Sequence, residues 1–79
     1  MTTQIDIRRQ IAERLATARE KAGYNTAAAF CAAQGFYLFD YYRHERAQSS
    51  ITASELIRYA DALSVTMGQL LLGIDDLPY

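Results

Sequence analysis

Residues 52 to 73, TASELIRYADALSVTMGQLLLG, decide the fold because they contain start and stop signals for two consecutive helices. Thr52 and Glu55 have the spacing of a capping box, in which the threonine oxygen accepts a backbone N–H three residues on and the glutamate reaches back. Thr66 and Gln69 repeat this spacing, and Gly73 can end the second helix. The apolar residues at helical spacing in these two segments are Leu56, Tyr59, Ala60, Leu63, Met67, Leu70 and Leu71.

The N-terminal segment also has helical spacing, and no part of the chain shows the sustained alternation of an amphipathic strand. Its apolar residues recur at steps of 4, 4, 3 and 4, at Ile7, Ile11, Leu15, Ala18 and Ala22. This spacing predicts a helix from about residue 4 to 22, with Gly23 as its C-terminal stop.

Two short helices are expected between these segments. Asn25 or Thr26 can cap an alanine-rich helix that runs to about Ala33 and ends before Gly35. The segment 37–46 contains no glycine or proline and is interpreted as a third helix. The sequence therefore predicts an all-α fold with five short helices and tight connections.

Length and composition set outer limits on the kind of protein. The 79 residues suit a single domain, with a core at about 4–73 and a short tail at 74–79, and they exclude a large enzyme fold. The composition, 51% hydrophobic and 22% charged, is typical of a globular chain. The single Cys31 leaves no intramolecular disulfide, and no Cys/His spacing indicates a metal site. We expect a cytoplasmic protein with no membrane segment and no cofactor.

The formal net charge of −1 hides an asymmetry between the two halves of the chain. Residues 1–50 contain seven cationic and five anionic side chains, for a net charge of +2, whereas residues 51–79 contain one and four, for −3. A polyanion is therefore expected to meet the first half of the chain.

Four stretches together resemble a known family. They are AGY at 22–24, the glycine at 35, YYRHERA at 41–47 and RYADALSVTMGQLLLG at 58–73. Over about residues 8–73 the chain is similar to the phage repressor and Cro-type (XRE) helix-turn-helix family, most closely to a prophage-associated branch. The resemblance implies a five-helix, lambda-repressor-like domain. It also implies a sequence-specific transcriptional regulator that binds double-stranded DNA as a homodimer, with the third helix in the major groove.

The same resemblance implies which residues face DNA: Thr26, Tyr37, Leu38, Phe39, Tyr42, Arg43, Arg46 and Arg9. Arg43 is the candidate base reader, because a guanidinium can donate two hydrogen bonds to guanine, whereas Arg46 and Arg9 suit phosphates. Each arginine could instead belong to a solvated face. Tyr37 could pack beneath the turn, and Thr26 could act as a helix cap alone.

Other residues are assigned to the scaffold. In the family pattern, Arg19 resembles an arginine that pairs with a glutamate at the end of the third helix, here Glu45. Phe30, Tyr41 and Cys31 are expected in the core, with His44 packed inward. The resemblance also implies a dimer interface formed by Met67, Leu70, Leu71, Ile74 and Leu77, which could alternatively continue the core. Ala47 stands where the family usually has a left-handed glycine.

A second class of function stays open. Aromatic and aliphatic residues in and before the third helix could form a protein-binding patch, so the chain could be an antirepressor-like or antitoxin-like interaction module. This patch comprises Phe36, Leu38, Phe39 and Tyr42. The sequence contains no constellation typical of an enzyme active site, so we do not expect an enzyme.

Overall fold

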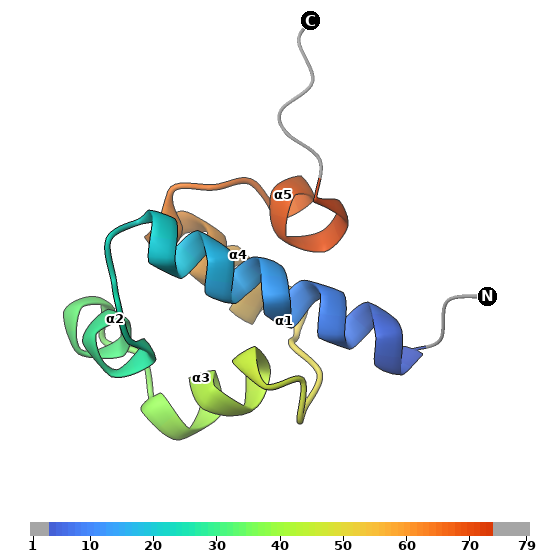
Figure 1. Cartoon of the computed structure of the whole chain (residues 1–79), viewed down its shortest axis with the longest axis horizontal. Helices are drawn as coiled ribbons and strands as arrows, with labels where there is room; N and C mark the ends of the chain where they lie inside the picture. The colour runs from blue at the N-terminus through green and yellow to red at the C-terminus, as the bar shows by residue number, and fades with distance from the viewer. Residues whose placement is uncertain (1–3, 74–79) are drawn as a thin grey trace, which may run out of the picture.

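Helix α1, Gln4–Lys21, crosses the middle of the molecule and is the longest of its helices (Figure 1). The computed structural model describes residues 4–73, and the side chains of residues 7–73. The remaining helices of this range are α2 (Ala27–Gln34), α3 (Leu38–Glu45), α4 (Ala53–Leu63) and α5 (Met67–Leu72). Helices α2 and α3 lie on one side of α1 and α5 lies on the other (Figure 1). No strand occurs among the described residues, so the all-α prediction is confirmed for them.

Local capping signals determine where most helices begin. The Thr52 and Thr66 side chains accept hydrogen bonds from Glu55 N and Gln69 N, and both reciprocal contacts of each capping box are present. Thr26 caps α2 through its side chain alone, with its Oγ1 accepting from Ala29 N at 3.1 Å. These three start signals were predicted correctly because each cap depends on residues only three positions apart.

Glycines end three of the helices. Gly23, Gly35 and Gly73 all have positive φ, the left-handed conformation that commonly follows a helix. Gly35 N donates to Cys31 O at 2.8 Å and so satisfies a carbonyl in the last turn of α2. The predicted stops are confirmed, although α1 ends at Lys21 and α2 at Gln34, each one residue from the expected position.

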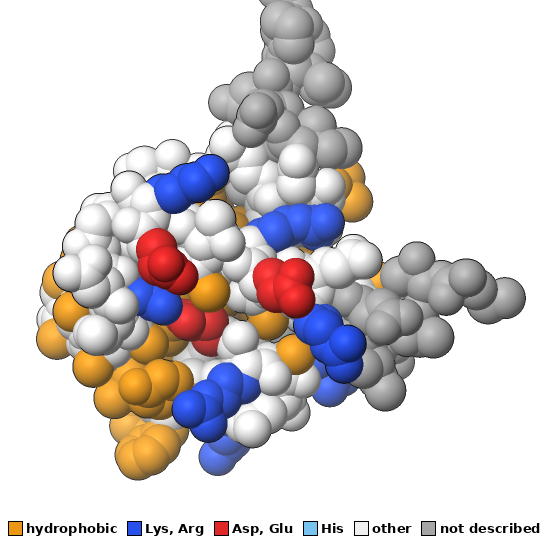
Figure 2. Space-filling view, viewed as in Figure 1, with side chains coloured by type: hydrophobic (Ala, Val, Ile, Leu, Met, Phe, Trp, Pro, Cys, Tyr) orange, Lys and Arg blue, Asp and Glu red, His pale blue; other side chains and the backbone are white. Residues whose placement is uncertain are grey.

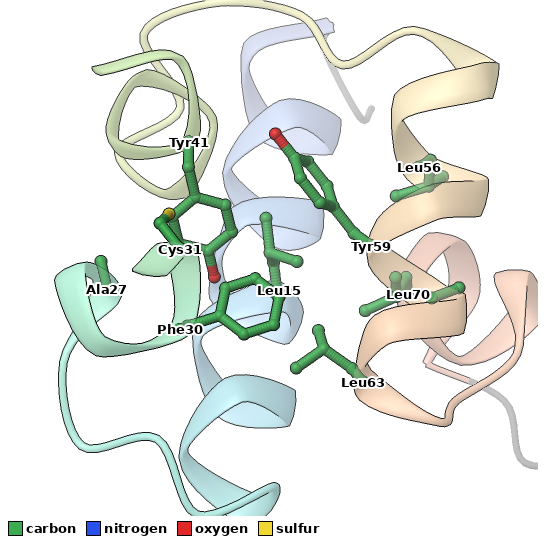
Figure 3. Packing of buried hydrophobic residues seen from close by; sticks show 10 residues of the cluster. Leu15, Ala27, Phe30, Cys31, Tyr41, Leu56, Tyr59, Leu63 and Leu70 are labelled. Carbon is green, nitrogen blue, oxygen red and sulfur yellow. The ribbon is translucent and has the colours of Figure 1, made fainter. Parts of the chain in front are cut away.

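The core gathers around Leu15 of α1, which is completely buried (Figure 3). Phe30 from α2, Tyr41 from α3, and Tyr59 and Leu63 from α4 surround it. The rings form a continuous series, with Phe30 and Tyr41 centred 5.1 Å apart and Tyr41 and Tyr59 5.3 Å apart. The expected burial of Phe30, Tyr41 and Cys31 is confirmed.

The apolar stripe predicted for α1 is correct only in its centre. Leu15 is buried and Ile11 and Ala18 are half-buried, but Ile7 is 46% exposed and Ala22 is exposed. The stripe fails at both ends because neither Ile7 nor Ala22 is part of the core cluster or packed against it.

Candidate functional site

Three residues, 35–37, connect α2 to α3. After the left-handed Gly35, Phe36 N donates to Cys31 O at 3.0 Å, which turns the chain at the end of α2. Tyr37 is the N-cap of α3, with extended backbone and no side-chain cap hydrogen bond. The third helix therefore begins at Leu38, one residue later than predicted.

The inner face of α3 is fixed to α1 by an ion pair. The Arg19 guanidinium donates from Nε to Glu45 Oε2 at 3.1 Å and from Nη2 to Glu45 Oε1 at 3.0 Å. Its Nη1 donates to the Tyr24 carbonyl at 2.7 Å. The two side chains are 9% and 14% exposed, and the hydrogen bonds to Glu45 raise the pKa of Arg19. The expected contact between these residues is present, and it determines where α3 lies against α1.

A second polar cluster fixes α3 to α4. His44 is 4% exposed, its Nδ1 lies 2.8 Å from the Tyr59 hydroxyl and its Nε2 lies 3.7 Å from Glu55 Oε1. Burial raises the pKa of Tyr59, so its hydroxyl stays protonated. The inward position of His44 agrees with the expectation, but neither partner was predicted, because no local signal relates residues 11 and 15 positions apart.

The outer face of α3 is aromatic and cationic. Phe39 is 65% exposed, and Tyr42, Arg43 and Arg46 are also exposed. The Arg46 guanidinium carbon lies 5.4 Å from the centre of the Tyr42 ring, a geometry typical of a cation–π contact. In Figure 2 the lower edge of the molecule, over α2 and α3, shows hydrophobic side chains beside Lys and Arg side chains.

Tyr37 adds a second exposed ring at the start of α3. It is 66% exposed, and its ring centre lies 5.8 Å from that of Phe39. The alternative in which Tyr37 packs beneath the turn is therefore wrong. We call the exposed side chains of Tyr37, Phe39, Tyr42, Arg43 and Arg46 the α3 surface.

Two residues expected on this surface belong largely to the core. Leu38 is half-buried and packs against the core cluster. Phe36 is also half-buried, with its ring 5.4 Å from Phe30 and 5.0 Å from Tyr59. The four-residue apolar patch is thus reduced to Phe39 and Tyr42.

The charge of α3 is divided between its faces. Arg43, Arg46, Asp40 and Glu45 sum to zero, but Glu45 points inward and is neutralised by Arg19. The exposed charges of the helix are then two cations and Asp40, for a net charge of +1. The α3 surface is therefore mildly electropositive although the helix sequence is neutral.

Three residues at the edges of the site are placed as follows. Thr26 is exposed at the start of α2. The hydrogen bond that it accepts from Ala29 N confirms its role as a helix cap. Arg9 of α1 is exposed. The neighbouring Arg8 donates from Nη2 to Ser50 Oγ at 3.0 Å, which links α1 to the loop after α3.

The expected dimer interface is altered by the structure. Leu70 is 1% exposed and belongs to the core, so its assignment to a dimer contact is wrong. Met67 is half-buried and packs against the same cluster, whereas Leu71 is 39% exposed. Ile74 and Leu77 lie outside the described residues. The alternative in which this helix continues the core thus holds for Leu70.

An open groove of about 470 Å³ lies between α1 and α5, on the side of α1 away from α3. Arg14 Nη1 donates to the Leu71 carbonyl at 2.7 Å across it. Within residues 7–73 no group of three or more His, Cys, Asp or Glu side chains is placed to hold a metal ion. None of the helices described is long and apolar enough to cross a bilayer.

The fold and site define an all-helical protein whose third helix presents an exposed aromatic and cationic face. Comparisons with protein-family profiles, curated proteins and solved structures found no match to this chain.

Proposed function

We propose that this chain is a sequence-specific DNA-binding regulator of the repressor or Cro type. In this proposal α2 and α3 form a helix-turn-helix, and α3 is the recognition helix that enters the major groove. The observation that carries the proposal is the division of α3 into two faces. Tyr41, His44 and Glu45 fasten one face to the scaffold, while Phe39, Arg43 and Arg46 point away from it.

The chemistry of this outer face suits DNA. Arg43 can donate two hydrogen bonds to the O6 and N7 atoms of a guanine, which contributes about 1 to 3 kcal/mol of discrimination. Arg46 and Arg9 contact phosphates in this arrangement, and the Thr26 end of α2 offers backbone N–H groups to another phosphate. Catalysis has no part in the proposal, because the inward His44 is used in packing.

A homodimer completes the proposal. Two copies of α3 would occupy successive major grooves about 34 to 36 Å apart. Leu71 and Leu72 of α5, which are 39% and 65% exposed, are the described residues that best support contact between the copies.

Salt dependence tests the proposal directly. Binding to a random-sequence duplex, measured by fluorescence anisotropy over a range of NaCl concentrations, should weaken linearly in a plot of log K against log salt. Arg46→Ala should reduce the magnitude of the slope by about 1, because one phosphate contact is lost.

Lys21→Ala is the matched control for this experiment. Lys21 is an exposed cation that lines the groove between α1 and α5, so its removal should leave the slope unchanged. Absent or salt-independent binding would contradict the DNA-binding proposal.

The exposed ring pair of Tyr37 and Phe39 favours a second candidate function, a protein-interaction module of antirepressor-like or antitoxin-like type. Exposed aromatic side chains are frequent hot spots of protein interfaces. Under this alternative Phe39→Ala abolishes a protein complex and Arg43→Ala has little effect. Under the DNA-binding proposal Arg43→Ala relaxes sequence specificity.

A further inference from the structure

We propose that the chain recognises thymine in double-stranded DNA through its C5-methyl group, with Phe39 as the specificity-determining residue. This inference rests on the DNA-binding function proposed above and names the base feature that the α3 surface reads. It concerns the residue on that surface that can form no hydrogen bond to a base edge.

The position of Phe39 suits contact with a base. It is the second residue of α3, and the N-terminal part of a recognition helix lies nearest the base edges. Phe39 is 65% exposed, and its ring centre lies 5.8 Å from that of the neighbouring Tyr37. The structure therefore presents an apolar ring at the place where a base reader is expected.

The chemistry of Phe39 selects one partner in the major groove. The edges of guanine, adenine and cytosine present hydrogen-bond donors and acceptors there, which a phenyl ring would leave unpaired. Thymine also presents a methyl group, to which an apolar side chain can pack. Contact with Phe39 is therefore more favourable for thymine than for the other three bases.

Arg43 supplies a second reading position at a defined spacing. It lies four residues after Phe39 on the same face of α3, about 6 Å further along the helix axis at 1.5 Å per residue. At about 3.4 Å per base pair, this distance corresponds to roughly two base pairs. If α3 lies along the groove, a thymine beneath Phe39 and a guanine bound by Arg43 are therefore about two base pairs apart in the half-site.

The charges beside Phe39 favour DNA over a protein as its partner. Arg43 and Arg46 follow it on the exposed face, and Arg46 lies against the Tyr42 ring. Asp40 next to Phe39 is also exposed, so the exposed charges of the helix sum to +1. A net positive charge beside an apolar ring complements a methyl group that lies between two phosphate backbones. An uncharged protein surface would leave both arginines without a partner.

The experiment removes the methyl group and nothing else. Duplexes that bind the full-length chain are selected from a random-sequence library over several rounds, and the enriched pool is then amplified once with dTTP and once with dUTP. The two pools have the same sequences and differ in the C5-methyl group. A buried methyl corresponds to about 0.8 kcal/mol, or about fourfold in affinity for each methyl contacted.

The wild-type chain should bind the thymine pool at least about fourfold more tightly than the uracil pool. Phe39→Ala should bring this ratio close to one, whereas Phe39→Leu, which keeps an apolar side chain, should retain part of it. Arg43→Ala should weaken binding to both pools and leave the ratio in place. Because Phe39 is exposed, these variants are expected to fold, as circular dichroism melting curves will verify.

Each other outcome overturns a specific claim. Equal binding of the two pools by the wild-type chain refutes methyl recognition while DNA binding itself stands. A ratio that survives in Phe39→Ala refutes the assignment to this residue. Failure to enrich any duplex refutes the proposed function together with this inference, and loss of a protein complex in Phe39→Ala would then favour the interaction module.

Discussion

Ala47 holds a backbone conformation that favours glycine. Its φ of 58° is left-handed, and the N–H of the next residue, Gln48, donates to the Arg43 carbonyl at 2.8 Å. This hydrogen bond belongs to a motif that commonly ends helices with glycine at the left-handed position. The Cβ atom of alanine is strained in this conformation. Ala47 therefore adopts the left-handed conformation that the resemblance implies for a glycine at this position.

Ala47→Gly should increase the free energy of unfolding by about 1 kcal/mol, because glycine adopts the left-handed conformation without strain. Urea denaturation followed by circular dichroism measures the change. Ala32→Gly is the matched control, since Ala32 is an exposed residue inside α2. There glycine should lower the free energy of unfolding by a similar amount. A loss of stability in Ala47→Gly would show that strain at this residue is negligible.

The position of a single residue was predictable from the sequence where it depends on residues nearby in the chain. Gly35 was assigned correctly because a helix stop depends on the preceding turn. The inward position of His44 was implied by the family resemblance, and His44 is buried. Leu70 and Phe36 were misassigned because their burial depends on which helices pack over them. No spacing within the sequence specifies that packing.

At the scale of a helix, the start of α4 depends on one carboxylate. Glu55 Oε1 accepts from Thr52 N at 2.9 Å and from Thr52 Oγ1 at 2.9 Å. The backbone hydrogen bond from Thr52 is the main reason that the pKa of Glu55 is lowered in the folded chain. The same carboxylate lies 3.7 Å from His44 Nε2, so the cap of α4 also supports α3.

The lowered pKa predicts a loss of stability in acid. Glu55 contributes fully above the ordinary pKa of a glutamate, about 4.3, and its contribution is lost as the pH falls through the lower pKa of the folded state. Glu55→Gln should therefore reduce the fall in melting temperature between about pH 5 and pH 3. The exposed Glu13→Gln is the control and should leave that fall nearly unchanged. An identical acid dependence in Glu55→Gln and the wild type would contradict this role.

The helices themselves were largely predictable, because capping pairs three residues apart mark the starts of α2, α4 and α5. The start of the third helix was harder to predict. Tyr37 makes no side-chain cap hydrogen bond, so the sequence contains no cap signal at this boundary. The residues of the α3 surface follow from the helical period once the resemblance gives the inward face of α3, but the half-burial of Leu38 depends on its packing against the core cluster.

At the scale of the whole molecule, the Arg19–Glu45 pair joins segments 26 residues apart. It orients the α3 surface because it fastens the C-terminal end of α3 to α1. It also removes Glu45 from the exposed charge of α3, so one contact serves both position and electrostatics. The total charge of Asp40, Arg43, Glu45 and Arg46 is zero, and this total does not show that Glu45 lies on the inner face of α3.

Glu45→Gln should lower the free energy of unfolding by about 2 kcal/mol, because Arg19 remains largely buried without a charged partner. Guanidinium denaturation measures the loss. Asp61→Asn, which removes an exposed carboxylate from α4, should change stability by no more than about 0.5 kcal/mol. If the two substitutions had equal effects, the pair would contribute no more than a surface charge.

The ring series of the core also determines how this protein can be observed by spectroscopy. The chain has six tyrosines and no tryptophan, and Tyr41 and Tyr59 are fixed with their rings at 87° to each other. Near-ultraviolet circular dichroism therefore reports the packing of these rings, since that signal is lost when tertiary packing loosens and helices persist. Tyr37 and Tyr42 are exposed on the α3 surface, so their rings lack the fixed surroundings of the two core tyrosines. The near-ultraviolet signal of an unlabelled sample therefore reports mainly on the core.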